Sequence, residues 1–364
     1  MVTIKLDRSR IEARQDCELL RYLSYHYRGK GIGPLEMPGP LLAGIVMHQC
    51  LDHLTTAARL SSLEEAWPHI EQCLAAYRTE LQTYGYDDHY VQEQWWLLTC
   101  LVKGFAVVRL PNILREYHII STEQEFVTEL MPGLDVMLRL DAVARHKGTN
   151  QLAILDYKTL KTVSTDWMIH HERSIQTMMY TYLLEEFSGE YVMGIQYEGL
   201  CKGYSQLDTA KSSPYQGREI QFSPFCYCYV GSNGAISWDW KSGLCRRACW
   251  DVFSSPKDLL LAMGDKLEAQ FPTIPPVKPV PEHWERFKHQ VSRAEKAFLD
   301  RMEYLRPEHE LEDAFLFFEQ NLSRCNKYGL KSRCPFLGIC HQCEDPDDPS
   351  VYTPRVPHHA SELE

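Results

Sequence analysis

The sequence lacks a long apolar run. No stretch of the 364 residues approaches the roughly 20 apolar residues that a membrane-spanning helix requires. The residues up to Cys17 carry charges at positions where a signal peptide would have its apolar segment. We therefore expect a cytoplasmic protein with no membrane partner.

An excess of positive charge is also missing. The chain has 38 Lys and Arg against 49 Asp and Glu, a net charge of −11, which argues against a protein that coats nucleic acid by bulk electrostatic attraction. A local basic groove remains compatible with this total, and candidate phosphate-binding residues occur at 27–31, 158–161, 245–247 and 323–333. Six acids, one Arg and four Pro gather in residues 344–364, and this composition predicts a disordered acidic tail.

Signature motifs of several enzyme classes are absent. The sequence has no Walker A motif, no GxGxxG and no HExxH, so nucleotide hydrolysis, dinucleotide binding and zincin chemistry have no support. It has no internal repeat. Hydrophobic residues make up 44% and charged residues 24%, which excludes a collagen, a coiled coil and a disordered chain.

The order of hydrophobic periodicities predicts an α/β fold. Helical patterns cover residues 10–28 and 41–58, and a capping-box sequence at Ser62 and Glu65 begins a helical insertion at about 60–107. Strand patterns then dominate the centre of the chain. We expect a central mixed β-sheet flanked by helices.

The C-terminal third is expected to add a helix and a cysteine-containing segment to the same domain. A Pro-rich linker at about 271–281 precedes a charged helix at about 282–305. The cysteine segment follows at about 320–343. We therefore predict one domain over residues 1–343.

Two acids and a lysine fall at the ends of neighbouring predicted strands. Asp141 ends one strand, and Asp156 and Lys158, which alternate onto the same face, end the next. A hairpin near Gly148 would bring the three together, and for this reason Asp141 is preferred to Asp135 as the first acid. Converging carboxylates suit Mg²⁺ or Mn²⁺, and an adjacent lysine can orient water and neutralise a developing charge, a combination that fits phosphodiester hydrolysis. An isolated DxK sequence is more often a surface ion pair, so the neighbouring motifs decide.

Those motifs carry a family resemblance. Gly44 and His48 in GIVMH, Asp141 in LRLDAV, the sequence ILDYKT at 154–159, and Gln176 with Tyr180 in QTMMY follow one another along roughly residues 10–185. Their order and spacing resemble the RecB-like branch of the PD-(D/E)XK nuclease superfamily. The resemblance implies a restriction-endonuclease-like core.

The resemblance also implies residue roles. His48, Asp141 and Asp156 would bind the metal, with the backbone carbonyl of Tyr157 as a further ligand, and Lys158 would assist the attacking water. Gln176 and Tyr180 would hold the strand and the substrate near the site, and Glu116 is a candidate supporting carboxylate. The chain departs from the family pattern in having no proline before Asp141 and in having Asp rather than Glu at position 156.

Clustered cysteines indicate a second metal site. Most of the thirteen cysteines should be reduced thiols in a chain without an export signal, yet Cys325, Cys334, Cys340 and Cys343 fall within nineteen residues. These four form one possible zinc site. The segment also resembles the end of RecB-like nucleases that carry an iron–sulfur cluster, and that resemblance implies a 4Fe–4S cluster in which Cys17 replaces Cys343 and closes the C-terminal segment onto the first helix.

These interpretations combine into a functional hypothesis. The chain is expected to be a divalent-metal-dependent deoxyribonuclease, an exonuclease rather than an endonuclease, acting on DNA ends or single strands. DNA repair, recombination, phage DNA processing or CRISPR adaptation would supply the context, and a helicase, a recombinase or a CRISPR adaptation protein the partner. The alternative is a non-catalytic nucleic-acid-binding or assembly protein on a nuclease fold.

Overall fold

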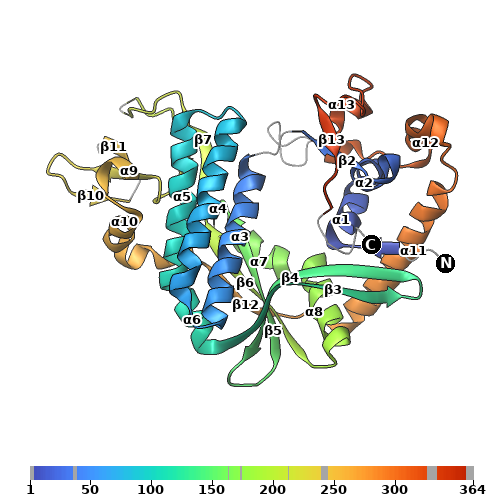
Figure 1. Cartoon of the computed structure of the whole chain (residues 1–364), viewed down its shortest axis with the longest axis horizontal. Helices are drawn as coiled ribbons and strands as arrows, with labels where there is room; N and C mark the ends of the chain where they lie inside the picture. The colour runs from blue at the N-terminus through green and yellow to red at the C-terminus, as the bar shows by residue number, and fades with distance from the viewer. Residues whose placement is uncertain are drawn as a thin grey trace.

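The computed structural model describes residues 4–35, 39–162, 164–172, 174–211, 213–238, 245–325 and 334–357. Its centre is a mixed β-sheet, as the sequence predicts, with the strand order β1-β4-β5-β6-β12 and with β3 paired to β4 (Figure 1). The strands of this sheet are β1 (Ile4–Leu6), β3 (Tyr117–Met131), β4 (Leu134–His146), β5 (Leu152–Leu160), β6 (Val192–Cys201) and β12 (Thr273–Val277).

Strand β4 has different neighbours at its two ends. Its first residues pair with β1 in parallel, Ile4 opposite Leu134, and its last residues pair with β5 in antiparallel, Ala142 opposite Leu155. The β4–β5 hairpin predicted near Gly148 is therefore confirmed. Because β5 leaves β4 after this pair, the ladder opens at the point where the predicted acids lie.

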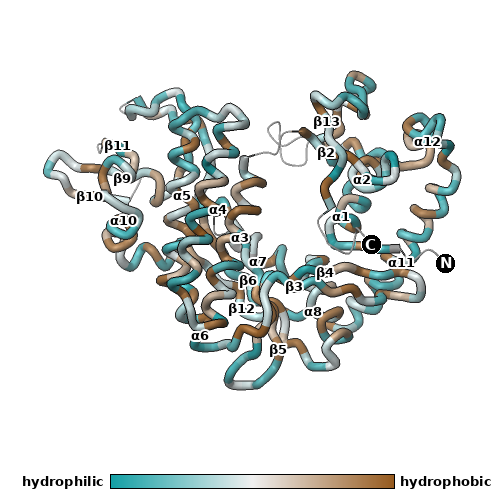
Figure 2. Tube along the Cα trace, viewed as in Figure 1, coloured by the Kyte–Doolittle hydropathy of each residue, from teal (hydrophilic) through white to brown (hydrophobic). Residues whose placement is uncertain are grey.

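Helices cover both faces of the sheet. Alternation along β5 places Ala153 and Leu155 in one core cluster with α3, α4 and α5, and Ile154 in a separate cluster that includes Leu184 of α8. Hydrophobic residues recur along these helices and strands (Figure 2). The helices packed around the sheet are α3 (Gly39–Arg59), α4 (Leu63–Thr83), α5 (Asp88–Val108), α6 (Leu110–Glu116), α7 (Thr165–Glu172), α8 (Ile175–Ser188) and α11 (Pro281–Met302).

The two ends of the chain pack together at one side of the sheet (Figure 1). Helix α2 shares a core cluster with the last turns of α11 and with the segments that follow it. Glu295 of α11 accepts a hydrogen bond from Arg14 at 2.8 Å and is paired with Arg21 at 3.2 Å. The elements here are α1 (Arg8–Asp16), α2 (Glu18–Tyr25), β2 (Ile32–Pro34), α12 (Glu310–Phe317), α13 (Leu337–Cys340) and β13 (Tyr352–Pro354).

Smaller elements lie beside the α4–α5 hairpin. They form a two-stranded and a three-stranded antiparallel sheet with two short helices. Their bounds are β7 (Tyr204–Leu207), β8 (Glu219–Phe222), β9 (Tyr227–Val230), β10 (Ile236–Ser237), β11 (Cys245–Ala248), α9 (Cys249–Val252) and α10 (Pro256–Met263). Short 3₁₀ turns occupy 27–29, 264–266, 268–270, 307–309 and 322–324.

Three sequence predictions about local structure are wrong. The helix predicted at 10–28 breaks at Cys17, whose extended backbone (φ −168°, ψ 126°) ends α1 and precedes α2. The predicted linker at 271–281 contains edge strand β12, where prolines are tolerated because one side of the strand needs no ladder hydrogen bond. The acidic tail has structure as far as residue 357, because β13 pairs with β2 and buries Tyr352.

One helical segment is more apolar than the sequence analysis allows. Asp88–Glu116 has a window with mean hydropathy of 1.6, and by length and composition alone it is long enough to cross a membrane. Inside the protein, 56% of that window is buried, as expected for a core helix. The length and composition of this one segment are therefore weak evidence for a membrane-spanning helix.

Candidate active site

The opened ladder between β4 and β5 holds the two predicted acids. Continuing the β4–β5 register by one residue places Asp141 directly opposite Asp156, on the same face of the sheet. The backbone N–H of Tyr157 donates to Asp141 Oδ2 at 2.8 Å instead of joining the ladder. The divergence of the strands therefore fixes the carboxylate of Asp141. The rival acid, Asp135, lies in the β1–β4 pairing, opposite Lys5.

Helix α3 brings His48 to Asp141. The imidazole Nδ1 lies 3.4 Å from Asp141 Oδ2. One turn earlier the helix passes close to β5, since a Cβ on Gly44 would lie 3.9 Å from Thr159 Oγ1. The predicted GxxxH spacing thus corresponds to a glycine that approaches the active strand and a histidine that reaches the acid at its edge.

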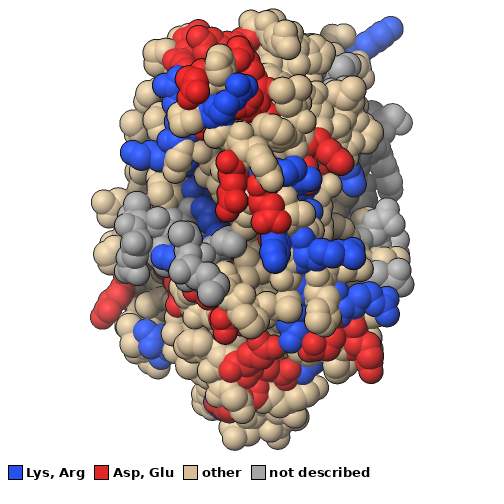
Figure 3. Space-filling model, turned by 90° about the vertical axis from the view of Figure 1, so that its right-hand side faces the viewer, with Lys and Arg blue, Asp and Glu red and all other residues tan. Residues whose placement is uncertain are grey.

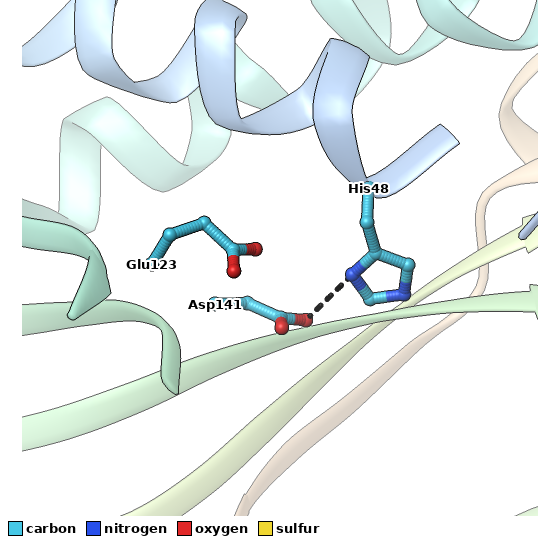
Figure 4. A group of neighbouring side chains, drawn as sticks. All are labelled: His48, Glu123 and Asp141. Atoms are coloured by element: carbon cyan, nitrogen blue, oxygen red, sulfur yellow. Dashed lines mark ion pairs between the residues drawn. The ribbon is translucent and has the colours of Figure 1, made fainter. Parts of the chain in front are cut away.

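A third potential ligand, Glu123, was missed by the sequence analysis. His48, Glu123 and Asp141 each offer one ligand atom, and these atoms all lie within 4.8 Å of one another (Figure 4). The β3–β4 register places Glu123 across from Asp141, between the pairs Thr122–Ala142 and Gln124–Leu140. Its backbone has a positive φ of 44°, an uncommon conformation for this residue type, at a position within this candidate metal-binding group.

The three side chains perturb one another's ionisation. The negative charge of Asp141 raises the pKa of His48. Burial opposes ionisation of Asp141, but the imidazole of His48 and the ammonium of Lys158 outweigh it and lower the pKa of this carboxyl. Burial and the nearby Asp141 raise the pKa of Glu123 from 4.5 to about 7. The cluster thus concentrates negative charge that a cation would neutralise.

Asp156 occupies a different position from the one expected for a metal ligand. It is only 1% exposed, and in the described part of the chain it does not belong to the group whose ligand atoms all lie within 4.8 Å. Its Oδ2 lies 2.5 Å from Lys158 Nζ and has no hydrogen bond of suitable geometry, while Oδ1 accepts from Gln176. Burial raises the pKa of Asp156.

Gln176 links Asp156 to the N-terminal helix. The amide of Gln176 donates to Asp156, and its oxygen accepts a hydrogen bond from Arg8 at the start of α1. Tyr180 lies one turn further along α8, where burial chiefly, and Asp156 in addition, raise its pKa. Both residues predicted from QTMMY therefore lie beside the acidic site, together with Arg8, which no local motif indicated.

Glu116 lies away from this cluster. It is exposed at the end of α6, next to Tyr117, which pairs with His146 at the far end of β4 from Asp141. The supporting carboxylate on this part of the chain is Glu123, seven residues later. The structure therefore does not bring Glu116 to the acidic cluster.

Four of the predicted cysteines line one cavity. Cys17, Cys325, Cys334 and Cys340 all border one cavity of about 130 Å³, with apolar walls that include Leu20 and Phe336. Cys343, the alternative fourth residue, is exposed, and its thiol donates to the carbonyl of Gly338. The break between α1 and α2 places Cys17 in this cavity.

Comparison with known proteins agrees with the fold. No curated protein matches the chain. The sequence model that matches describes the PD-(D/E)XK nuclease superfamily, and the match covers residues 7–341. That range includes His48, Glu123, Asp141 and Lys158 as well as most of the cysteine segment. A match over nearly the whole chain, to a structure with a mixed sheet that opens at two acids, shows that this protein belongs to the PD-(D/E)XK nuclease superfamily.

Proposed function

We propose that this protein is a divalent-metal-dependent deoxyribonuclease. The observation that carries the proposal is the group of His48, Glu123 and Asp141, which offers carboxylate and imidazole ligands beside Lys158 at the opened edge of the sheet. Oxygen-rich ligand sets of this kind fit Mg²⁺ or Mn²⁺. Bound there, a divalent cation supplies charge neutralisation at the phosphate and activation of water.

The side chains of this group would divide the work. Asp141 and Glu123 would hold the cation with His48, and the N–H of Tyr157 would keep Asp141 oriented. The Tyr157 carbonyl, on the same peptide segment, remains our proposal for a further ligand. Lys158, with 22% of its side chain exposed, would carry positive charge to the phosphoryl oxygens or hold the attacking water.

Asp156 would be a buried ligand behind the group of His48, Glu123 and Asp141. In the structure its carboxylate is occupied by Lys158 and Gln176. Asp156 Oδ2, which pairs with Lys158 and has no hydrogen bond of suitable geometry, would be available as a ligand to the cation, and Lys158 would be the cationic group nearest to the substrate. We retain Asp156 as a metal ligand on this basis, and Gln176, supported by Arg8, as the residue that orients it.

We further propose an iron–sulfur cluster in the cysteine cavity. A single zinc ion would hold four sulfurs about 3.8 Å apart, from a Zn–S distance of about 2.3 Å in a tetrahedron. Among the described residues, no three cysteines have sulfurs within 4.8 Å of one another. This wider arrangement of Cys17, Cys325, Cys334 and Cys340 favours the larger 4Fe–4S cluster over zinc. Its role would be to hold the chain ends together, since metal bonds made only in the folded state stabilise it.

The proposed subtype is an exonuclease of the RecB-like branch that acts on DNA ends or single strands. The resemblance of the cysteine segment supports the branch. DNA repair, recombination, phage DNA processing and CRISPR adaptation are the contexts in which we place it, with a helicase, a recombinase or an adaptation protein as partner.

A cleavage assay tests the proposal. Purified protein should degrade end-labelled single- or double-stranded DNA with Mg²⁺ or Mn²⁺ and not with EDTA. Asp141→Asn and Glu123→Gln should abolish cleavage without loss of helical signal in circular dichroism, whereas Asp135→Asn is the matched control and should cleave like wild type. Binding of DNA with no cleavage of any end type would instead identify a non-catalytic binding protein.

A further inference from the structure

A cavity separate from the metal site lies beyond the ends of the two parallel strands β5 and β6. It measures about 950 Å³. Lys161 follows the last residue of β5, and Lys202 follows the last residue of β6, whose Cys201 is the register partner of Leu160. The N–H of Lys202 donates to the carbonyl of Leu160 at 2.8 Å, so the two lysines emerge side by side at the cavity wall.

Among the residues that the structure describes, these two lysines have no acidic partner. Across the described ranges of the chain, neither Lys161 nor Lys202 forms an ion pair with a carboxylate. Burial, and after it the positive charge of Lys161, lower the pKa of Lys202, which is how two ammonium groups close together behave when no anion separates them. Such a pair is a preorganised site for an anion with more than one charge.

Lysines and arginines are interspersed with acids on one face of the protein. On the face viewed in Figure 3, the described Lys and Arg lie among Asp and Glu, and acidic groups gather near its top and bottom. The total of −11 agrees with this view. A nucleic acid therefore needs local unpaired cations, and Lys161 and Lys202 meet that requirement.

The cavity is aligned with the metal site. Pro40 lines the cavity, and Pro40, Gly44 and His48 follow one another at intervals of four residues along α3. Eight residues at about 1.5 Å each separate Pro40 from His48 by about 12 Å along the helix axis. On the strand side, Lys161 lies three residues after Lys158. A polynucleotide in the active site would reach the cavity within a few nucleotides.

Aromatic side chains form the rest of the wall. Tyr204 is 41% exposed and stacks on Phe222, with ring centroids 5.4 Å apart. Tyr86 and Tyr90 also line the cavity and stack on each other at 4.6 Å. Flat, partly exposed rings beside cations are the features that bind single strands, because every base can stack on them.

Acids in the cavity restrict where the phosphates can lie. Asp87, Asp88 and Glu219 line it as well, and Glu219 accepts a hydrogen bond from Ser205 at 2.7 Å. A sugar–phosphate backbone would be repelled from these carboxylates, so its phosphates belong at the lysine end and its bases at the tyrosines. A volume near the upper end of the roughly 300–1,000 Å³ of small-molecule pockets accommodates a short single strand and not a duplex.

We propose that this cavity binds the single-stranded part of a DNA substrate next to the cleaved bond, with Lys161 and Lys202 on its phosphates and Tyr204 under a base. This site deepens the proposed nuclease function and rests on it for the identity of the ligand. It assigns the substrate class as single-stranded DNA or a duplex with a frayed end.

The test measures binding separately from cleavage. Fluorescence anisotropy with a labelled oligo-dT in EDTA would compare wild type with the Lys161→Gln/Lys202→Gln double variant. Loss of two phosphate contacts should reduce the slope of log affinity against log salt by about 1.4, from about 0.7 per contact on single strands. The exposed lysines Lys257 and Lys296, changed to Gln together, are the matched control and should leave the slope unchanged.

A second variant isolates the stacking contact. Tyr204→Ala should bind oligo-dT about 5- to 150-fold more weakly, as removal of one base–aromatic stack does, and should bind an abasic oligonucleotide like wild type. Tyr204 is exposed on a short strand, so the fold should persist, and circular dichroism checks this.

The outcomes separate the two proposals. Wild-type affinity and salt slope in the lysine double variant would overturn the cavity site even if the protein cleaves DNA. Tighter wild-type binding to a blunt duplex than to a single strand would overturn it too. Loss of single-strand binding in the variants, combined with no cleavage by wild type in any divalent metal, would support the cavity and reject the nuclease.

Discussion

Replacing Glu123 by Gln gives the sharpest test of the proposed metal-binding group of His48, Glu123 and Asp141. Burial and Asp141 raise the pKa of Glu123 from 4.5 to about 7, and only 28% of the side chain is exposed. A carboxyl whose pKa is higher in the folded than in the unfolded state contributes stability below pH 4.5, and this contribution is lost as the pH rises to 7. This rise of about 2.5 in the pKa corresponds to about 3 kcal/mol, which is an upper bound because the side chain is partly exposed and solvent screens its interactions.

The metal-free variant should therefore be more stable than wild type at pH 8 and similar at pH 4.5. Urea unfolding in EDTA at pH 4.5, 6, 7 and 8 measures the difference, which should grow to between about 1 and 3 kcal/mol. Glu129→Gln, an exposed change on the same strand, is the control and should shift neither end of the profile.

Adding Mn²⁺ should reverse the order of stability. Wild type gains stability from the bound cation, and Glu123→Gln, with one anionic ligand fewer, gains much less. Because binding displaces the Glu123 proton, wild-type affinity for Mn²⁺ should fall about tenfold per pH unit below 7. Parallel pH profiles for wild type and variant in EDTA, or equal stabilisation of both by Mn²⁺, would refute the assignment of Glu123 to the metal group.

Further predictions concern Lys158, which we propose acts in catalysis, the cysteines and the N-terminal arginine. Lys158→Met should lower the cleavage rate by at least about a hundredfold while Mn²⁺ still stabilises the protein, measured by single-turnover cleavage and thermal melting; cleavage near the wild-type rate would contradict its role. Anaerobically purified protein should contain about four irons, Cys17→Ser should lose them and Cys343→Ser should keep them, by metal analysis and visible absorbance. One zinc per chain would instead favour the zinc alternative. Arg8→Ala should reduce kcat more than it changes KM, because Arg8 acts through Gln176, and an unchanged kcat would contradict this.

The sequence was sufficient for the acids of the hairpin because their positions follow from local rules. Strand alternation puts Asp156 and Lys158 on one face, and the turn near Gly148 sets Asp141 opposite Asp156. What the alternation could not reveal is the direction of the Asp156 carboxylate. Its contacts come from α8 and Lys158, so its burial depends on tertiary packing.

Glu123 could not be found by periodicity. It lies on a long strand whose regular alternation gives no sign of a positive φ, and the strand shifts register between Ile119 and Ser121 shortly before it. A shift of this kind changes which residues face the core. Because the sequence does not show the register of this strand, it gives no basis for preferring Glu123 to Glu116 as the supporting carboxylate.

The errors at the chain ends have a common physical cause. Proline content predicts linkers and tails, yet β12 and β13 are edge strands in which proline leaves the paired side intact. The break at Cys17 carries no Gly or Pro signal, and the contacts at this point come from the distant C-terminal segment, where Leu19 N–H donates to the carbonyl of Glu319. Local sequence cannot report a partner three hundred residues away.

Helix α1 connects the two proposed metal sites. Its first residue, Arg8, hydrogen bonds Gln176, which holds Asp156, and the residue after its end, Cys17, lines the cysteine cavity. Nine residues at about 1.5 Å per residue give a rigid element of about 13 Å, further held by the Arg14–Glu295 ion pair. Loss of the proposed cluster ligand Cys17 would release the C-terminal end of this helix. The hydrogen bonds from Arg8 through Gln176 to Asp156 would then be weakened. Activity of Cys17→Ser should therefore fall together with that of Arg8→Ala, and the double variant should be no worse than the more damaged single variant. Additive losses in the double variant would show that the two sites act independently and that the cluster stabilises the fold without positioning the active site.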